Sequence, residues 1–443
     1  MLRILSTCYM FPRVDSSLPH DYLTAKSSGS FGLAGPVLAA VVLHAAILVV
    51  PLLQPAAFGP FGMRALHDDQ IYFDYGSRAL AGAVPYRDYL VEYPPLAVAL
   101  FALPRLVTDR FGPYVLWFAA EMLLFDALAV YLVARRTAAH RGLPTVPARL
   151  AWYTAFLAAL YPLAGTRYDL APAAVALAGT TAWFGSRPVL GGVLAGAGAL
   201  LKLFPAVLAV PAAAVEARFG PPARGRGLAA FGVVVVAGGG LWTITGGAAS
   251  LGYHLGRGLQ IETVWAGALM MADHFVGAVP AWHAGHNSVE LVAPGAAVLA
   301  SIGIPVQLAM LGAVAWRARQ DAVREPIRWA AAAILAFILP GKVLSPQYLI
   351  WLVPFMPVLE APAGRSSRWV FLFACTATTA EYLASRRLTS FELWAIALLN
   401  CRNALLVALF VLLVKRDRGE GRSDPRRSLG PAPLIDEDAL GRG

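Results

Sequence analysis

The sequence has few charged residues for its length. Charged residues make up 14% of the 443 positions and hydrophobic residues make up 58%, whereas soluble domains carry about 25% charge. The mean hydropathy is +0.61. This balance excludes an ordinary soluble globular protein and predicts a polytopic membrane protein.

Cysteine is also scarce, and a secretory leader pattern is missing. The three cysteines, Cys8, Cys375 and Cys401, show no motif spacing, so we expect neither a disulfide framework nor a metal knuckle. About 30 mixed residues precede the first apolar run, without the short basic start and small-residue cleavage site of a signal peptide. We therefore expect that run to remain as an anchor.

Lysine is rare beside the many arginines, with Lys26, Lys202, Lys342 and Lys415 as the four examples. A lysine kept within or beside an apolar segment points to a need for a compact ammonium group, such as one that binds phosphate. For Lys342, snorkelling of the side chain to the membrane interface is the alternative. The net charge of +10 comes from arginine clusters that act as topology signals, so no nucleic-acid partner is expected.

Apolar runs of about 17 to 25 residues predict transmembrane helices. The predicted spans are 34–54, 112–134, 150–166, 169–185, 228–246, 291–316, 327–340, 347–361, 369–384 and 392–414. Two further runs do not fit an upright span. The run 94–107 is short enough to be re-entrant or interfacial, and 190–215 is predicted to be a hairpin broken near Lys202 and Pro205, so the count lies between 10 and 13.

The arginine clusters set the expected orientation, because basic loops stay in the cytoplasm. The clusters expected on that side are Arg135/Arg136/Arg141/Arg149, Arg218/Arg224/Arg226, Arg317/Arg319/Arg324/Arg328 and the tail KRDRGEGRSDPRR. The predicted organisation is a cytoplasmic segment 1–33, a membrane domain 34–414 with external loops at about 55–111 and 248–290, and a disordered basic tail 415–443. Most of the unusual polar residues then fall on the external side, which predicts an active site at that boundary.

The first external loop contains the strongest candidates for chemistry. Asp68 and Asp69 closely follow the first span, where apolar surroundings would raise a carboxyl pKa and make it a usable base. Solvated loop carboxylates are the alternative. Tyrosines and carboxylates follow in YFDYGSRALAGAVPYRDYLVEYPP, a mixture that suits sugar recognition, although interfacial tyrosines also form belts without a binding role.

Charged residues recur near the ends of later spans. Arg167 and Asp169 lie in TRYDLAP, and Arg257, Gln260 and Glu262 lie in HLGRGLQIETVW. A structural salt bridge is the alternative for each of these charges, because charges at membrane depth usually pair.

Metal and nucleotide chemistry lack support. His274, His283 and His286 lie in DHFVGAVPAWHAGH, without helical ligand spacing or a clear carboxylate partner, so no zinc site is predicted. Neither a glycine-rich phosphate loop after a strand nor a Ser/His/Asp motif is recognisable. We expect no metal and no cofactor.

Six stretches in order between residues 68 and 354 carry a family resemblance: DDQIYFDYGSRALAG, VPYRDYLVEYPPL, RYDLAP, ALLKLFPAVLAVP, RGLQIE and GKVLSPQYLIWLVP. Together they resemble the polyprenol-phosphate-dependent membrane glycosyltransferases of the GT-C class, especially glycosyltransferase family 87, the alpha-(1→2)-mannosyltransferase-like proteins of actinobacteria. The resemblance implies an all-α, GT-C-like bundle with a large first external loop. The implied donor is a lipid-linked sugar, typically polyprenyl-phosphate mannose, and the acceptor is a hydroxyl of a glycolipid or glycan.

The resemblance also implies residue roles. An aspartate followed by a tyrosine four positions later selects Asp68, with Tyr72, as general base of an inverting transfer, and Asp69 as the second choice. From the chemistry of a departing phosphate, which needs cationic stabilisation, we expect Arg257 and Lys342, with Lys202 as a third cation, to stabilise the donor phosphate. The residues expected to bind sugar or acceptor, or to hold the cations in place, are Tyr72, Arg87, Glu92, Tyr93, Gln260, Glu262 and Gln347.

Two other classes of function remain open from the sequence. A secondary transporter also uses broken helices with charged residues near a membrane site, but the chain has no convincing internal repeat. A scaffold that keeps a glycosyltransferase fold without activity is the other alternative. For the enzyme, mannose is a family-level expectation, arabinose or another lipid-linked sugar would require similar groups, and the expected location is the plasma membrane with an external active site.

Overall fold

The computed structural model describes residues 30–53, 66–185, 187–217, 225–321, 325–360 and 364–415. Several sequence-based predictions lie outside these residues, namely most of the N-terminal segment 1–33, the tail after Lys415, part of the first external loop at 54–65, Arg218, Arg224 and Arg324.

The described residues fold mainly into helices. Five of these helices are long and apolar enough to cross a membrane: α1 (Ser30–Leu53), α5 (Phe111–Arg141), α11 (Arg226–Ile244), α14 (Ala296–Asp321) and α18 (Leu393–Val414). The other helices that pack among them are α6 (Val146–Ala159), α7 (Tyr161–Ala164), α8 (Leu170–Trp183), α13 (Val264–Val276), α15 (Pro326–Ile338), α16 (Gly364–Leu383) and α17 (Ser385–Thr389). The predicted all-α polytopic fold is confirmed.

The two apolar runs that did not fit a simple span form short, interrupted helices. The run 94–107 forms α4 (Pro95–Ala102) and the 3-10 helix η3 (Pro104–Leu106). The run 190–215 forms α9 (Pro188–Leu201), η5 (Phe204–Leu208) and α10 (Ala209–Glu216). Lys202 separates α9 from η5 in extended backbone, so the predicted broken hairpin is present.

Two local features differ from the sequence-based expectation. The predicted span 347–361 is not an α-helix; it contains the 3-10 helices η6 (Pro346–Leu352) and η7 (Met356–Val358), because Pro346, Pro354 and Pro357 interrupt α-helical hydrogen bonding. The segment between α13 and α14 contains an antiparallel hairpin of β1 (Ala281–Gly285) and β2 (Ser288–Val292), which the sequence did not predict.

A buried polar cluster joins α1, α5 and α6 inside the bundle. His44 Nδ1 lies 2.6 Å from Asp126 Oδ2, and the Tyr153 hydroxyl donates to Asp126 Oδ1 at 2.8 Å. His44 Nε2 contacts Thr154 Oγ1 at 2.9 Å. His44 and Asp126 are fully buried, so each group satisfies the polar atoms of the others where water is excluded.

Replacing Asp126 with alanine should destabilise this part of the bundle. The change leaves His44 and Tyr153 buried without their partner, and breaking a buried pair in this way costs about 3–5 kcal/mol of unfolding free energy. Thermal unfolding in detergent would measure the effect, with Asp109→Ala at an exposed position as the matched control. Equal melting temperatures for the two variants would contradict the structural role of the cluster.

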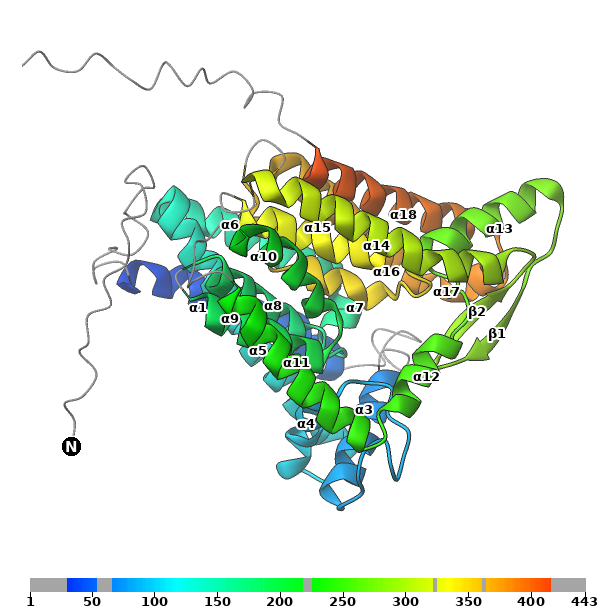
Figure 1. Ribbon diagram of the computed structural model, residues 1–443, viewed down its shortest axis with the longest axis horizontal. Helices are drawn as coiled ribbons and strands as arrows, with labels where there is room; N and C mark the ends of the chain where they lie inside the picture. The colour runs from blue at the N-terminus through cyan, green and yellow to red at the C-terminus, as the bar shows by residue number, and fades with distance from the viewer. Residues whose placement is uncertain are drawn as a thin grey trace, which may run out of the picture.

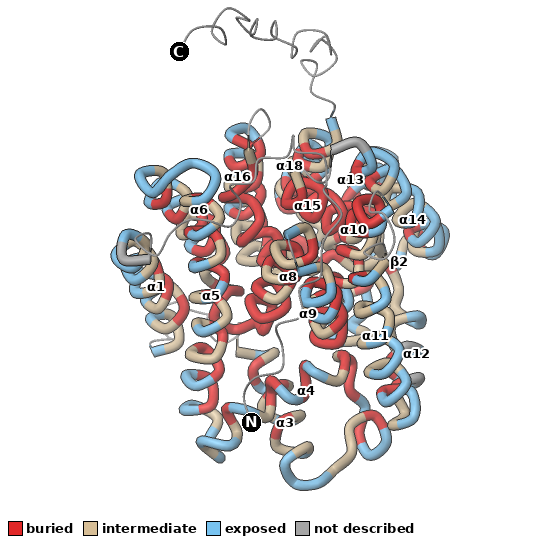
Figure 2. Tube along the Cα trace, turned by 60° about the vertical axis from the view of Figure 1, so that its left-hand side comes forward, coloured by how far each residue is buried: buried red, intermediate tan, exposed pale blue. Residues whose placement is uncertain are grey.

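The elements around the predicted site residues lie together at one end of the bundle. In Figure 1, α3 (His67–Leu80) and α4 lie beside α12 (Ala248–Gly256), with β1 and β2 adjoining α12. Figure 2 shows α3 and α4 at the opposite end from α6 and the start of α16, with buried residues facing the middle of the bundle. A Cβ atom on Gly76 would lie 2.3 Å from the Phe101 carbonyl oxygen, so glycine allows α3 to pack directly against the end of α4.

Candidate active site

Asp68 lies in the first turn of α3, at one side of the candidate active site. Asp68 Oδ2 lies 2.7 Å from Arg167 Nε, and Asp68 Oδ1 lies 3.4 Å from His67 Nδ1. The Asp68 side chain is 22% exposed and that of Arg167 is 6% exposed. Burial alone would raise the pKa of Asp68, but Arg167 and His67 outweigh this effect and hold the pKa below its usual value. Asp68 is therefore ionised at neutral pH and accessible.

Asp69 has the opposite environment. Consecutive helical residues point about 100° apart, and Asp69 is fully buried. Neither of its carboxyl oxygens has a hydrogen-bond partner among the described residues. Burial raises the pKa of Asp69 well above its usual value, which favours the neutral form of this carboxyl. The pKa values of these two adjacent carboxyls are shifted in opposite directions, so Asp68 is the potential base and Asp69 is the buried acid.

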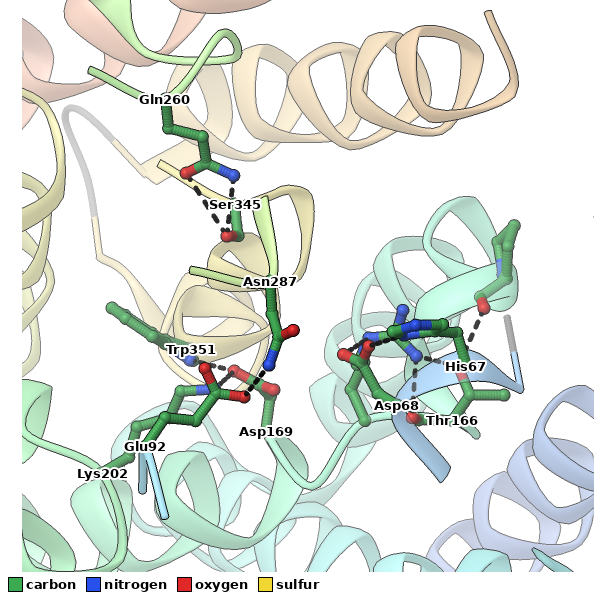
Figure 3. Close-up of polar contacts among 12 residues, drawn as sticks. His67, Asp68, Glu92, Thr166, Asp169, Lys202, Gln260, Asn287, Ser345 and Trp351 are labelled. Carbon is green, nitrogen blue, oxygen red and sulfur yellow. Dashed lines mark hydrogen bonds and ion pairs between the residues drawn. The ribbon is translucent and has the colours of Figure 1, made fainter. Parts of the chain in front are cut away.

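The five-residue connection between α7 and α8 carries Arg167 and Asp169 and so links Asp68 to a second charged group. Arg167 pairs with Asp68, whereas Asp169 lies 2.6 Å from Lys202 Nζ. Tyr168 lies between them in sequence, and its ring centroid is 4.4 Å from Lys202 Nζ. Trp351 Nε1 also donates to Asp169. Figure 3 shows Lys202, Asp169 and Trp351 together on one side of the site and Asp68 with His67 on the other.

Glu92 joins the segment before α4 to α12 and to the turn of the β-hairpin. Its carboxylate accepts hydrogen bonds from the Tyr253 hydroxyl at 2.9 Å and from Asn287 Nδ2 at 3.2 Å. Its carbonyl oxygen lies 2.7 Å from His254 Nε2. Glu92 is 8% exposed, and Figure 3 shows it near Lys202 and Asp169. The structure thus places Glu92 in the site as a link between α12, the β-hairpin and the first loop.

Arg257 and Lys342 form a basic pair beside this link. Lys342 Nζ donates to the carbonyl oxygens of Leu255 and Arg257, both at 2.8 Å, which leaves one of its three N–H groups for another acceptor. Burial and the neighbouring Arg257 lower the pKa of Lys342. Arg257 Nε is buried without a hydrogen-bond partner in the described part of the chain. This arrangement can accept an anion.

The β-hairpin holds the segment that carries Arg257. Glu290 on β2 accepts a hydrogen bond from the Gly258 N–H at 2.9 Å. It also lies 3.2 Å from His283 Nε2 and 2.8 Å from His286 Nδ1. No carboxylate partner for these histidines was evident from the sequence, but the hairpin register pairs His283 with Glu290. Among the described residues, no group of three or more potential metal ligands is found.

Gln260 and Glu262 have structural partners. Gln260 Oε1 accepts from the Leu344 N–H at 3.0 Å, and Gln260 Nε2 donates to Ser345 Oγ at 3.2 Å, so Gln260 fixes the turn that follows Lys342 (Figure 3). The carbonyl oxygen of Glu262 accepts from Arg402 at 2.8 Å. Burial, together with Glu381, raises the pKa of Glu262.

The remaining predicted residues occupy different environments. Tyr72 is 1% exposed and stacks on Phe101 with ring centroids 4.2 Å apart. Tyr93 meets Tyr168 edge to face at 5.4 Å. Tyr72 also meets Tyr168 edge to face, with ring centroids 5.7 Å apart, so both rings pack against Tyr168. Arg87 is 66% exposed and pairs with Asp88 at 2.8 Å, and Gln347 is half-buried at the start of η6.

The structure adds aromatic and amide groups that the predicted site did not include. Tyr168 and Tyr348 lie below and beside Lys202, and Trp351 stacks on Tyr348 with centroids 4.0 Å apart. Asn287 contacts Glu92 from a left-handed backbone conformation with φ of 51°. Tyr168 and Tyr348 lie inside two of the stretches that carry the family resemblance, and this position was the signal in the sequence that could have identified them as site residues.

Comparison with known proteins identifies the family. Residues 90–346 match the sequence pattern of glycosyltransferase family 87, and no curated protein matches the chain. The matched range includes Glu92, Arg167, Lys202, Arg257 and Lys342, and it begins after Asp68. More than half of the chain is covered, and the chain therefore belongs to glycosyltransferase family 87, a family of membrane glycosyltransferases.

Proposed function

We propose that this glycosyltransferase moves a sugar, with mannose as the first candidate, from a polyprenyl-phosphate donor to a hydroxyl of a glycolipid or glycan. The transfer takes place within a GT-C-like bundle at the outer face of the plasma membrane. One observation carries the proposal: an ionised, accessible Asp68 lies on one flank of a site whose other flank holds Arg257, a cation without a carboxylate in ion-pair contact among the described residues.

Asp68 is the general base of the proposed reaction. The acceptor O–H gives its proton to the Asp68 carboxylate while the acceptor oxygen forms a bond to the anomeric carbon. The bond between that carbon and the phosphate oxygen breaks on the opposite face, so the anomeric configuration inverts. Arg167 and His67 keep Asp68 ionised and oriented, and both therefore act as positioning residues.

The leaving group needs cationic stabilisation. The phosphate diester departs with the electron pair of the broken bond and becomes a monoester, which adds one negative charge. Arg257 and the free N–H of Lys342 are available to stabilise that charge. Lys202 is held by Asp169 and makes a smaller contribution, because its charge is already paired.

Glu92, Asn287 and the rings around Lys202 form the proposed sugar-binding surface. Carboxylate and amide groups hydrogen-bond hydroxyls, and the faces of Tyr348 and Trp351 provide flat apolar area. Glu92 retains unused lone pairs after its two hydrogen bonds, since an ionised carboxylate has about four acceptor sites.

The proposed function is tested by following labelled sugar in liposomes that contain the purified chain. Radiolabelled polyprenyl-phosphate mannose, other lipid-linked sugars, and the corresponding nucleotide sugars are supplied separately with an acceptor glycolipid extract. We expect label in a new glycolipid or glycan from a lipid-linked donor and none from a nucleotide sugar. Transfer from nucleotide sugars alone would refute the lipid donor, and vesicle uptake of free sugar without bond formation would indicate a transporter.

Arg167 should control the pH dependence of transfer. The reaction needs Asp68 deprotonated, so kcat/KM falls as the pH drops through the pKa of Asp68. Because that pKa is lowered, the wild-type enzyme should lose base function only below about pH 4. Arg167→Gln removes the main interaction that lowers the pKa of Asp68, so burial then raises that pKa. The acidic limb of the kcat/KM profile therefore moves to higher pH. Arg167→Lys keeps the positive charge and should shift the acidic limb less. Identical acidic limbs in the wild type and in both variants would contradict the positioning role of Arg167.

A further inference from the structure

A second basic cavity lies at the opposite end of the bundle from the active site. It has a volume of about 450 Å³ and lies between the last turn of α5, the 3-10 helix η4 (Leu143–Thr145) and the first turns of α6 and α16. The residues that line it are Arg141, Pro144, Thr145, Ala148, Arg149, Arg365 and Arg368. Tyr114 on α5 contacts the Phe101 carbonyl near the active-site end, and the 27 residues from Tyr114 to Arg141 span about 40 Å of helix.

Positive charge in this cavity exceeds negative charge. Glu360 pairs with Arg141, and it lies 3.8 Å from Arg149. Glu360 is the one carboxylate in ion-pair contact with the four lining arginines among the described residues. Glu325 also acts electrostatically on Arg141, so four guanidinium groups face two nearby carboxylates, and like charges held this close repel one another. A bound anion would relieve that repulsion.

Arg368 supplies a second observation that points to a ligand. The residue is 9% exposed, and its Nη1 group donates to the Leu359 carbonyl oxygen at 2.9 Å. Its Nε atom is buried without a hydrogen-bond partner in the described part of the chain. An unsatisfied buried donor is costly, so a bound acceptor would compensate for it.

Helix geometry favours an anion at the same place. The cavity is bordered by the N-terminal turns of α6 and α16, and the positive end of a helix dipole attracts negative charge. Thr145, which precedes α6, forms no side-chain cap. Trp152 packs against Trp369 at 4.8 Å between centroids, and Trp369 is 45% exposed. Exposed tryptophan is typical of the headgroup depth of a membrane.

We propose that this cavity is a binding site for a phosphate group, separate from the sugar-transfer site. The guanidinium forks of Arg365 and Arg368 bind the phosphate oxygens, with Arg149 at the side of the cavity. A phospholipid headgroup and a soluble phosphate ester share this chemistry, so the experiment separates the two sources.

The test measures retention of phosphate ligands by the full-length chain. One arm uses phosphatidylglycerol in phosphatidylcholine nanodiscs and counts bound lipid by native mass spectrometry. The other arm titrates inorganic phosphate against delipidated protein by calorimetry. The variants are Arg365→Gln with Arg368→Gln, which removes two donors, and Ala148→Phe, which fills the cavity and keeps every charge. Arg135→Gln, an exposed arginine on α5 that does not line the cavity, is the matched control.

We expect both cavity variants to weaken binding by about tenfold or more in at least one arm, with Arg135→Gln equal to wild type. Loss in the nanodisc arm identifies a lipid headgroup as the source, and loss in the calorimetric arm alone identifies a soluble phosphate. Binding that is unchanged in Ala148→Phe and in the double-arginine variant would overturn the proposal, as would an absence of binding to wild type in both arms. The Ala148→Phe variant keeps the test decisive if the double variant does not fold.

Discussion

Asp68→Asn is expected to lower the rate of sugar transfer by about 10²- to 10⁴-fold. The amide keeps the shape of the side chain but cannot take the proton of the acceptor hydroxyl. The donor KM should change little, because Asp68 acts on the acceptor side of the reaction. The loss corresponds to roughly 3 to 5 kcal/mol of transition-state stabilisation. Initial rates with purified protein and saturating lipid-linked donor would measure it.

Asp69→Asn is the matched control for this prediction. Asp69 is buried, and its raised pKa favours the neutral carboxyl, which an amide matches in shape and charge. We expect a rate within a few-fold of wild type, since substitutions that preserve both shape and charge disturb a site little. A large loss in Asp69→Asn with a nearly normal rate in Asp68→Asn would reverse the assignment of the base.

Arg257→Gln is expected to lower kcat by about 10²- to 10³-fold. The phosphate gains charge as the sugar leaves, and Arg257 lies beside Lys342 with an Nε that has no hydrogen-bond partner in the described part of the chain. Its stabilising effect is therefore greater in the transition state than in the ground state, so kcat should fall more than the donor affinity. Single-turnover rates and donor binding, measured separately, would resolve the two effects.

Two further variants make the Arg257 prediction specific. Arg257→Lys keeps the charge but loses the fork geometry, so we expect an intermediate rate. Arg87→Gln removes an arginine that pairs with Asp88 at an exposed turn of the first loop, and its effect should be small. If Arg87→Gln slows transfer as much as Arg257→Gln does, the donor phosphate is not bound where we propose.

The sequence predicted most of the helical fold, because apolar length is a local property of the chain. The starts and ends of α11 and α18 lie within two residues of the predicted spans, whereas α5 continues seven residues beyond its predicted end at 134. Lys202 marks the break between α9 and η5. The irregular segment 346–358 was mistaken for a helix because hydropathy outweighed its prolines in the prediction. The β-hairpin was missed because HAGHNSVE has few β-branched residues, and its pairing depends on the tertiary setting.

The sequence indicated several residues of the candidate site, but it did not indicate which of their side chains contact one another. The stretches that contain Asp68, Glu92, Arg257 and Lys342 were singled out from their charges and tyrosines. The pairing of Arg167 with Asp68, which the sequence left open as a structural salt bridge, is present at 2.7 Å.

Long-range contacts in the site were beyond a sequence reading. Trp351 and Asp169 are 182 positions apart, and no local pattern indicates that their side chains meet. The residues alone also did not indicate which of Asp68 and Asp69 is exposed and which is buried, because that depends on which face of α3 is covered by the neighbouring helices.

The anomeric configuration of the product tests the central claim most directly. The purified chain would be given a lipid-linked sugar of known configuration, and the new linkage would be determined by NMR alongside the polyprenyl phosphate released. A single displacement assisted by Asp68 predicts an inverted linkage and one polyprenyl phosphate released for each sugar transferred. A retained configuration, or transfer without release of polyprenyl phosphate, would contradict it.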